Sequence, residues 1–444
     1  MIEKDLKELA EKIISRSNAE DIVLNISETK SYNIRFAGNN ITTCGAINRL
    51  NISIRSIFGK RSGSANINSI DDGTIENGLR TSEKLAKLAP EDEEFTPPEE
   101  GGQEYLHVKE YFEDTAKMES RERIDLIRHV IEECVRRDLI SAGYIETSDR
   151  GSAVANSRGV FVYHPSSEID FSATVRTKDG TGSSKIHRIY SDNSELDSVA
   201  LSEEVIAKSE LSRNPQELKP GKYTVVLEGA ATCDLLANLQ WYLNRRSADE
   251  GRSYFSDKVN GNKIGQKVAS DVVNIYSNPA DNIAPSSPFN YDGTPVNKIN
   301  WIENGILKNM PTDRFWAFKT KSDSIPYPTN FIFEGNNDRT LNDLIASTDY
   351  GVLVTRFWYI RGVDPKQILL TGLTRDGVFL IEDGKITKPL KNFRFNESPM
   401  NVLNNIMDMS ANKRSVGSET GRSKIVVPDI KVKDFNFSSI SDAI

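Results

Sequence analysis

The sequence predicts an α+β protein of two parts, and three observations lead to this prediction. In the first part, segments such as Leu50–Ile57 alternate apolar and polar residues with period two, and helical stretches separate them. In the second part, Asn-Gly and Asp-Gly pairs lie between alternating apolar runs, a pattern typical of antiparallel hairpins. Apart from a helix over 230–244, the helical stretches in that part are short. We therefore expect an N-terminal mixed sheet with covering helices and a C-terminal curved or barrel-like, largely antiparallel sheet.

The N-terminal α+β domain is expected over residues 1–215. Its predicted elements are a helix over 3–16, strands over 22–27, 32–36 and 50–57, and helices over 72–88, 120–138 and 193–211. Residues 89–104 are acidic and contain Pro-Pro and Gly-Gly pairs, which predicts an internal loop. The stretch 140–190 is rich in strand-forming residues. Its turn signals lie at Asp149–Gly151, Asn156–Gly159 and Lys178–Gly180.

The C-terminal β-rich domain is expected over residues 216–444. Hairpins are predicted at Glu303–Gly305, Arg375–Gly377 and Glu382–Gly384. Short helices are predicted near 313–318, 341–347 and 400–407, and the last clear strand lies at 424–427.

Composition excludes some classes of function. The 444 residues carry a formal net charge of -8, which argues against a nucleic-acid-binding surface. No stretch approaches the roughly 18 apolar residues that span a bilayer, so no membrane association is expected. Cys44, Cys134 and Cys233 are far apart and form no C-x-x-C pair. Such cysteines are typical of a reducing compartment, and we expect a cytoplasmic protein.

Two segments contain candidate binding residues. The predicted helix over 230–244 has an apolar stripe at helical spacing, formed by Leu235, Leu236, Leu239 and Leu243, which indicates a core-facing helix. Trp241 and Tyr242 lie off this stripe, where an interface role and ordinary packing remain open alternatives. Arg245, just after the helix, is a further interface candidate.

The second segment is the string Arg356-Phe-Trp-Tyr-Ile-Arg361, in which two arginines bracket three aromatic residues. Arg356, Trp358 and Arg361 are candidates for binding a peptide backbone or terminus, because arginine offers a rigid fork of donors. The alternative is a plain strand with Phe357 and Tyr359 on one face and Trp358 and Ile360 on the other.

Several segments, in order and spacing, resemble one known family. They are Tyr223–Phe255, which includes Ser247-Ala-Asp-Glu-Gly-Arg-Ser-Tyr-Phe255, then Ser287–Pro295, Ile302–Lys308, Gly351–Arg361 and Leu370–Gly384. Together they resemble the TldD/PmbA (TldE) family, once called modulators of DNA gyrase. The resemblance covers nearly the whole chain and is strongest in its C-terminal half.

The resemblance implies a metallopeptidase family whose zinc-binding members carry H-E-x-x-x-H on the helix over 230–244 and a cysteine near the C-terminus. In this chain Ala237 and Tyr242 stand at the histidine positions and Asn238 at the glutamate position. No histidine follows His187 and no cysteine follows Cys233. Ser415–Ser423 takes the place of the cysteine segment, and Ser418 is expected to lie in a flexible tail. We therefore expect no metal in this chain, since zinc requires imidazole, thiolate or carboxylate ligands.

The active form of the family, as the resemblance implies, pairs a zinc-bearing chain with a metal-free one and degrades unfolded or modified peptides, which are gripped as extended strands. This chain matches the metal-free partner, inactive alone, with zinc in a TldD-like paralogue. The alternative is a homodimeric peptide-binding or chaperone-like module without proteolytic activity. A metal-independent hydrolase is a weaker third possibility.

Overall fold

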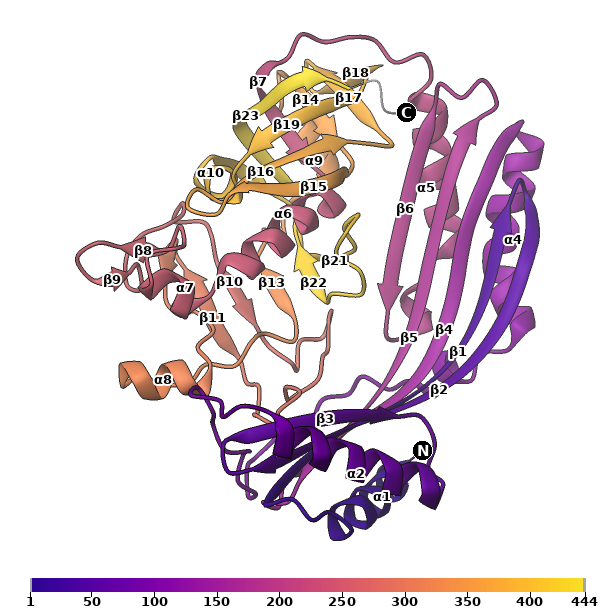
Figure 1. The fold of residues 1–444 in the computed structure, drawn as a ribbon. Helices are drawn as coiled ribbons and strands as arrows, with labels where there is room; N and C mark the ends of the chain where they lie inside the picture. The colour runs from indigo at the N-terminus through magenta and orange to yellow at the C-terminus, as the bar shows by residue number, and fades with distance from the viewer. Residues whose placement is uncertain (1, 442–444) are drawn as a thin grey trace.

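The computed structural model describes residues 2–441, which form a six-stranded N-terminal sheet and, in the C-terminal part, a nine-stranded sheet, a six-stranded sheet and a two-stranded sheet. Figure 1 shows the N-terminal sheet standing opposite the C-terminal part, where α6 lies between two groups of strands. The arrangement of helices and sheets confirms the predicted α+β fold.

The N-terminal sheet has the strand order β3-β2-β1-β4-β5-β6, and all its neighbouring strands are antiparallel. Its strands are β1 Asp21–Ala37, β2 Asn40–Phe58, β3 Arg61–Ile67, β4 Leu139–Asn156, β5 Phe161–Thr177 and β6 Ser183–Tyr190. The sequence predicts a mixed sheet here, and the structure corrects this to an antiparallel one. Tight turns join most consecutive strands. One of them has positive φ at Gly38 and Asn39, 58° and 63°, which suits a two-residue hairpin turn.

Two of the three predicted turns in the 140–190 stretch are confirmed, and the third is wrong. Asn156–Gly159 and Lys178–Gly180 connect β4 to β5 and β5 to β6. Asp149–Gly151 instead lies inside β4, where Gly151 is paired with Glu28 on one side and Pro165 on the other. Ladder hydrogen bonds on both sides hold this segment extended despite its turn-forming residues.

Helices cover this sheet in two groups. They are α1 Glu3–Ser15, α2 Asp72–Leu88, α3 Glu113–Ala116, α4 Ser120–Arg136 and α5 Ser198–Leu211, with a 3-10 turn at Asn193–Glu195. Leu6 of α1 and Ile75 of α2 are buried in one core, and Val130 of α4 and Val205 of α5 in another. The sequence identified four of these helices because their apolar residues recur every three to four positions.

The two C-terminal sheets are largely antiparallel. The nine-stranded sheet has the order β15-β16-β19-β23-β7-β14-β17-β18, with β20 beside β23; the six-stranded sheet has the order β12-β11-β10-β13-β22-β21. Parallel pairs occur at β7 with β14 and at β13 with β22. Within the described residues β15 and β18 are the two end strands of the nine-stranded sheet, so this sheet is open. Its strands are strongly curved (Figure 1).

The strands of the nine-stranded sheet are β7 Gly221–Leu227, β14 Tyr350–Val354, β15 Phe357–Asp364, β16 Leu369–Thr374, β17 Val378–Glu382, β18 Lys385–Pro389, β19 Phe393–Glu397, β20 Ile406–Met409 and β23 Ile430–Ile440. The six-stranded sheet contains β10 Ile275–Ser277, β11 Ile299–Glu303, β12 Ile306–Leu307, β13 Phe331–Phe333, β21 Lys413–Ser415 and β22 Ile425–Val427. The remaining elements are β8 Ser256–Asp257, β9 Gly261–Asn262, α6 Gly229–Tyr242, α7 Arg245–Asp249, α8 Arg314–Thr320, α9 Leu341–Ala346 and α10 Pro399–Asn404.

Two of the three predicted hairpins are confirmed. Glu303–Gly305 joins β11 to β12, and Glu382–Gly384 joins β17 to β18. Arg375–Gly377 is a correction, because β16 and β17, which it connects, are not neighbours in the sheet. The prediction from sequence also stops too early, because it places the last strand at 424–427 and omits β23. β23 follows β22 and places Phe435 and Phe437 in the core, where the rings of Phe393 and Phe437 stack at 4.5 Å.

The predicted loop over 89–104 runs from the N-terminal sheet along the C-terminal part. Glu94 pairs with Arg246 at 2.6 Å, and Arg314 donates to the Pro97 carbonyl oxygen at 2.6 Å. Further along, the Tyr105 hydroxyl donates to the carbonyl oxygen of Gly293 at 2.7 Å. These contacts fasten the two parts together on one side of the molecule.

Among residues 2–441, no helix combines the length and the apolar character that a membrane span requires.

Candidate functional site

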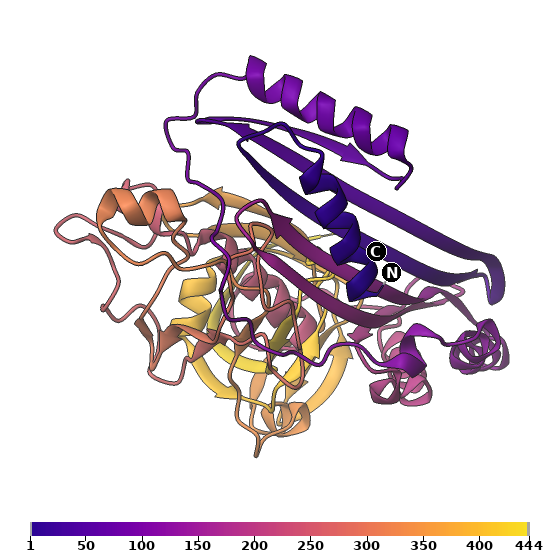
Figure 2. The same cartoon turned by 90° about the horizontal axis from the view of Figure 1, so that it is seen from below.

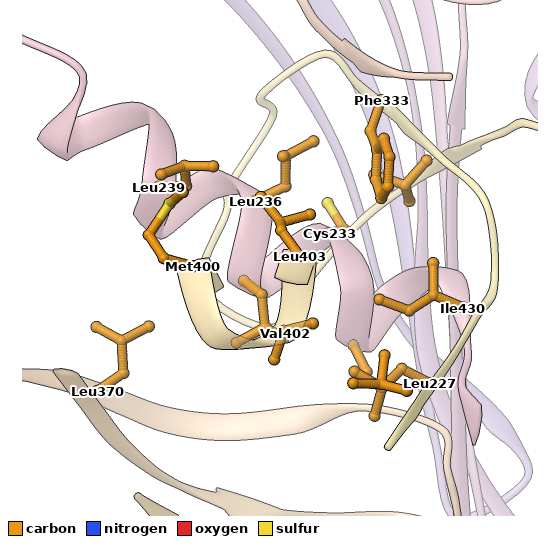
Figure 3. Packing of buried hydrophobic residues seen from close by; sticks show 14 of the residues in the cluster. Leu227, Cys233, Leu236, Leu239, Phe333, Leu370, Met400, Val402, Leu403 and Ile430 are labelled. Carbon is orange, nitrogen blue, oxygen red and sulfur yellow. The ribbon is translucent and has the colours of Figure 1, made fainter. Parts of the chain in front are cut away.

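Helix α6 has one face buried in the largest hydrophobic core. Leu235, Leu236, Leu239 and Leu243 are at most 3% exposed, which confirms the predicted core-facing stripe. Figure 3 shows Leu236 and Leu239 of α6 packed close to Met400, Val402 and Leu403 of α10. The helix N-terminus is capped from the connection between β22 and β23, since the Gly229 backbone N–H donates to the Asp429 carboxylate at 2.7 Å. The helix is therefore a rigid base for whatever its other face presents.

The other face of α6 lines a cavity of about 680 Å³. Asp234, Ala237, Asn238 and Trp241 line it, spaced three to four residues apart as one side of a helix requires. The segment after β21 closes part of the wall, and Tyr327 and the start of α7 contribute the rest. This cavity is the candidate functional site.

Asp234 is the buried polar group of the cavity, with 1% of the residue exposed. Its carboxyl accepts hydrogen bonds from the Ser418 backbone N–H at 2.8 Å and from the Ser418 hydroxyl at 2.9 Å. Burial raises the pKa of Asp234 to about 7, and the Ser418 and Glu419 donors together with the Arg356 charge oppose that rise. Asp234 is thus a carboxyl that changes charge near neutral pH.

Residues 413–424, which we call the strap, pass between the two parts of the molecule. Near its start, Lys413 pairs with Asp429 at 2.6 Å. At its end, Arg422 pairs with Glu146 and Glu168, and Lys424 pairs with Glu110. All three glutamates belong to the N-terminal part and are largely buried. The expectation of a flexible tail around Ser418 is therefore wrong, because Asp234 and these ion pairs hold the strap in place.

Trp241 extends into solvent at the rim of the cavity, with 85% of the residue exposed. Across the cavity the Asn244 side-chain amide donates to the Tyr327 hydroxyl at 2.7 Å. Tyr242 does not line the cavity but packs partly buried against the main core. Arg245 lies outside the cavity lining, in α7, where its guanidinium approaches Asp249 at 3.5 Å. Of these candidates, only Trp241 presents its side chain to the site.

The aromatic string does not follow the simple alternation that the sequence predicts. Pairing between β15 and β16 shifts register between Trp358 and Arg361, and Tyr359 has a φ of 55°. This bulge turns both Phe357 and Ile360 into the core and leaves Tyr359 exposed. The predicted strand is present, but the assignment of side chains to its faces is wrong.

The two arginines of the string differ in role. Arg356 is buried and pairs with Asp376 at 2.8 Å, and the guanidinium groups of Arg356 and Arg375 lie 5.4 and 5.3 Å from the centre of the Trp358 ring. Arg361 is on the surface and pairs with Glu419, which lines the cavity, at 2.9 Å. Arg361 therefore contacts the site through its ion pair with Glu419 of the strap, whereas Arg356 is buried and does not line the cavity.

The residues present do not fit a zinc ion. Zinc requires about four donors in tetrahedral arrangement, three of them from the protein in a catalytic site. In this cavity Asp234 is occupied by Ser418, Glu419 by Arg361, and Ala237 carries no donor. Cys233 points to the Ser415 carbonyl oxygen at 3.3 Å, and burial raises the pKa of its thiol. Among the described residues no group of three His, Cys, Asp or Glu side chains could hold a metal.

Three of the four histidines have carboxylate partners in the N-terminal part. His129 pairs with Glu203, His164 with Glu110 and His187 with Asp170, at 2.7 to 2.8 Å. Each of these three histidines therefore has a carboxylate partner within the N-terminal part.

Family models match three consecutive regions of the chain. Residues 23–89 match domain 1 of the PmbA/TldA metallopeptidases, 113–213 the central domain and 220–439 the C-terminal domain. The chain belongs to the TldD/PmbA family. The resemblance seen in the sequence is thereby confirmed, and the fold has the architecture of this family.

Known relatives place the TldD/PmbA fold over the whole chain. TldE from Thermococcus kodakarensis has a TM-score of 0.84 at 19% identity, covering 98% of this chain and 99% of that one. A protein described as a modulator of DNA gyrase from Bacteroides thetaiotaomicron has a TM-score of 0.86 at 17% identity, covering 99% and 100%. A metalloprotease TldD homolog of Buchnera aphidicola is 29% identical over 229 residues, which is 46% of this chain and 44% of that protein. The sequence match therefore spans less than half of that relative.

The sequence missed Asp234, Ser418 and Glu419 as site residues. Asp234 lies one helical turn before Asn238, so helical spacing alone places it on the same face. The sequence does hold one indication of its role, since Asp234 is flanked by Cys233, Leu235 and Leu236. A charged residue in an apolar stretch requires a partner when it is buried. The partner lies 184 residues away, and no local pattern reveals a contact over that separation.

Proposed function

We propose that this chain is the metal-free, peptide-binding subunit of a TldD/TldE-type metallopeptidase that acts on unfolded or modified peptides. Zinc would be held by a TldD-like paralogue, and this chain would form one wall of the peptide cleft. The donor set at α6 carries the proposal: where zinc-binding members have histidine, glutamate and histidine, this chain has Ala237, Asn238 and Tyr242. Three free cysteines, two of them buried, support a reducing, cytoplasmic setting for the complex.

The cavity beside α6 has the chemistry that an extended peptide needs. Its wall carries side-chain amides at Asn238, Gln240 and Asn244, and amides both donate to and accept from a peptide main chain. Trp241 offers a large apolar surface at the rim. Main-chain recognition of this kind tolerates many sequences, which suits a peptidase for unfolded substrates.

Reconstitution of the two chains tests whether the paralogue supplies catalysis and this chain supplies peptide binding. The purified chain is expected to leave an unfolded peptide intact, whereas a mixture with the zinc-bearing paralogue cleaves it and a chelator stops the cleavage. The variant Trp241→Ala should raise the KM of the mixture for peptide with little change in kcat, because Trp241 lies at the rim. Phe318→Ala is the matched control, since Phe318 is also 85% exposed but lies on α8 outside the cavity lining.

The partner is identified by affinity purification from the native host followed by mass spectrometry. A paralogue with H-E-x-x-x-H recovered at near one-to-one ratio supports the proposal. Recovery of this chain alone, as an oligomer that protects a bound peptide from added protease, would support the homo-oligomeric peptide-binding module instead.

A further inference from the structure

Strand β6 of the N-terminal sheet contacts β21, and a small cavity lies beside this contact. Figure 2 shows the indigo strands of the N-terminal sheet farthest from the C-terminal part and its magenta strands closest to it. β6, the start of α6 and the strap all contribute to the wall, and we call this space the β6 cavity. Its volume of about 40 Å³ holds about three water molecules, at roughly 10–15 Å³ for each. It therefore suits one small ion and nothing as large as a peptide.

Five lysine and arginine side chains line the β6 cavity, and two of them have no carboxylate partner among the described residues. The three that are paired are Lys208 with Glu204 and Glu228, Arg356 with Asp376, and Lys413 with Asp429. Lys185 forms no hydrogen bond or ion pair within the described part of the chain. Arg188 donates to the carbonyl oxygen of His187 at 3.0 Å and forms no ion pair with a described carboxylate. Five cations therefore share four carboxylates.

Lys185 is the cation that an anion in the β6 cavity would stabilise most. Burial lowers the pKa of Lys185, the Arg356 charge lowers it further, and the Asp376 carboxylate opposes both. A cation that is partly removed from water without a counter-charge destabilises the fold. A further donor is the backbone N–H of Ala230, which lines the cavity in the first turn of α6, where N–H groups have no partner within the helix.

Glu228 determines which anion fits, because one of its oxygens needs a donor. The residue is 9% exposed, and its Oε2 accepts from Lys208 at 2.7 Å. Its Oε1 is buried and has no hydrogen-bond partner among the described residues. An anion beside this oxygen must therefore bring a proton to donate. At neutral pH inorganic phosphate always carries at least one proton, whereas sulfate carries none.

We propose that the β6 cavity binds one inorganic phosphate ion. Its unprotonated oxygens accept hydrogen bonds from Lys185, Arg188 and the Ala230 N–H, and its P–OH group donates to Oε1 of Glu228. The bound ion also stabilises the strap, because Ser418 lines the β6 cavity and holds Asp234 in the cavity beside α6. This site lies outside the proposed peptidase role. Phosphate binding is measured on the chain alone, so either proposal can fail without the other.

Isothermal titration calorimetry on the full chain, in a phosphate-free buffer of constant ionic strength, tests the proposal. The native chain is expected to bind one phosphate saturably. Lys185→Met should weaken this binding by about tenfold or more, whereas Lys185→Arg should retain it. Without phosphate, Lys185→Met should melt no lower than the native chain, because it removes an unpaired cation. The matched control is Lys178→Met on the turn between β5 and β6, a lysine outside the cavity lining, which should bind phosphate as the native chain does.

Sulfate tests the role of Glu228. Sulfate should bind the native chain about tenfold more weakly than phosphate or worse, because it cannot donate to Oε1. Glu228→Gln supplies an amide donor there and should bring sulfate close to phosphate. An absence of saturable phosphate binding would overturn the proposal. So would phosphate binding that Lys185→Met leaves unchanged, or sulfate binding as tight as phosphate in the native chain. Equal binding of glycerol phosphate would overturn the assignment to free phosphate, since the cavity has no room for the ester group.

Discussion

Buried carboxylates lie on both sides of the strap, but they are neutralised in different ways. On the N-terminal sheet, Glu146 and Glu168 pair with Arg422, and on the segment beside it Glu110 pairs with Lys424. On α6, the direct partners of the Asp234 carboxyl among the described residues are the Ser418 hydroxyl and the backbone N–H groups of Ser418 and Glu419. The pKa of Glu110 is accordingly lowered by His164 and Lys424 against its burial, whereas that of Asp234 is raised by burial.

This difference distinguishes contacts that hold the strap in place from a contact that depends on pH. The ion pairs of Arg422 and Lys424 give each of these buried glutamates a cationic partner, so they fix the strap to the N-terminal part. Asp234 holds the strap against the cavity through a carboxyl that titrates near neutral pH. The strap is therefore held by ion pairs at its end and by a titratable carboxyl, Asp234, beside the candidate site.

The largest effect is expected from breaking the anchored side. Lys424→Ala removes the lysine cation from buried Glu110, which keeps its contact with His164, and should lower the free energy of unfolding by about 3–5 kcal/mol. Urea denaturation followed by tryptophan fluorescence measures this loss. The double variant Glu110→Gln with Lys424→Met should recover most of it, because no unpaired charge remains. A loss below about 1 kcal/mol for Lys424→Ala would show that the pair does not anchor the strap.

The next effect is the pH dependence that Asp234 contributes. Its pKa is raised from 3.8 to about 7 in the folded chain, so between these values the folded state holds more protons than the unfolded one. Stability from this group is therefore present at low pH and lost as pH rises through 7. Each pKa unit corresponds to about 1.4 kcal/mol, giving a loss on the order of 4 kcal/mol. Asp234→Asn should remove this slope, measured as the difference from the native chain between pH 4 and pH 8. Parallel curves for the two proteins would contradict the account.

A smaller effect is expected from Ser418→Ala. Losing one hydroxyl donor to the carboxyl should cost about 0.5–1.5 kcal/mol and move the pKa of Asp234 further up, because the Ser418 hydrogen bond lowers it. The midpoint of the pH dependence should shift upward, and hydrogen exchange over residues 415–423 should accelerate. Ser423→Ala, in the same strap but without a bond to Asp234, is the control. An unchanged midpoint would mean that Ser418 does not hold the carboxyl.

The smallest stability effect is expected for Trp241→Ala. An 85% exposed side chain contributes little to folding, so the change should stay within about 0.5 kcal/mol. Peptide binding, measured by fluorescence anisotropy of a labelled unfolded peptide, should weaken all the same. Binding that is unaffected, or a loss of stability above about 1 kcal/mol, would remove Trp241 from the site.

Local patterns predicted much of the fold. The apolar stripe of α6 and the helices of the N-terminal sheet follow from spacing, because burial of one face imposes a period on the sequence. Predictions failed where distant partners decide the structure. Asp149–Gly151 stays extended because β1 and β5 bond to it on both sides. Asp376 lies between β16 and β17 without forming a hairpin, and its carboxylate accepts a hydrogen bond from the Ser183 hydroxyl of the N-terminal sheet.

The candidate site was only partly predictable for the same reason. Ala237, Asn238 and Trp241 share a helix face, so spacing and the family resemblance place them together. Ser418 and Glu419 come from a segment with turn-forming residues on both sides, which in isolation indicates a loop. Their position depends on Asp234 and on the ion pair between Arg422 and Glu146. These contacts join residues that are 184 and 276 positions apart in the sequence.

Metal analysis of the purified chain tests the central claim most directly. The full chain would be incubated with excess zinc, passed through a desalting column, analysed for metal by mass spectrometry and assayed on an unfolded peptide. We expect far less than one zinc per chain and no cleavage, because Ala237, Asn238 and Tyr242 supply no ligand set. About one zinc per chain, with peptide cleavage that a chelator abolishes, would contradict it.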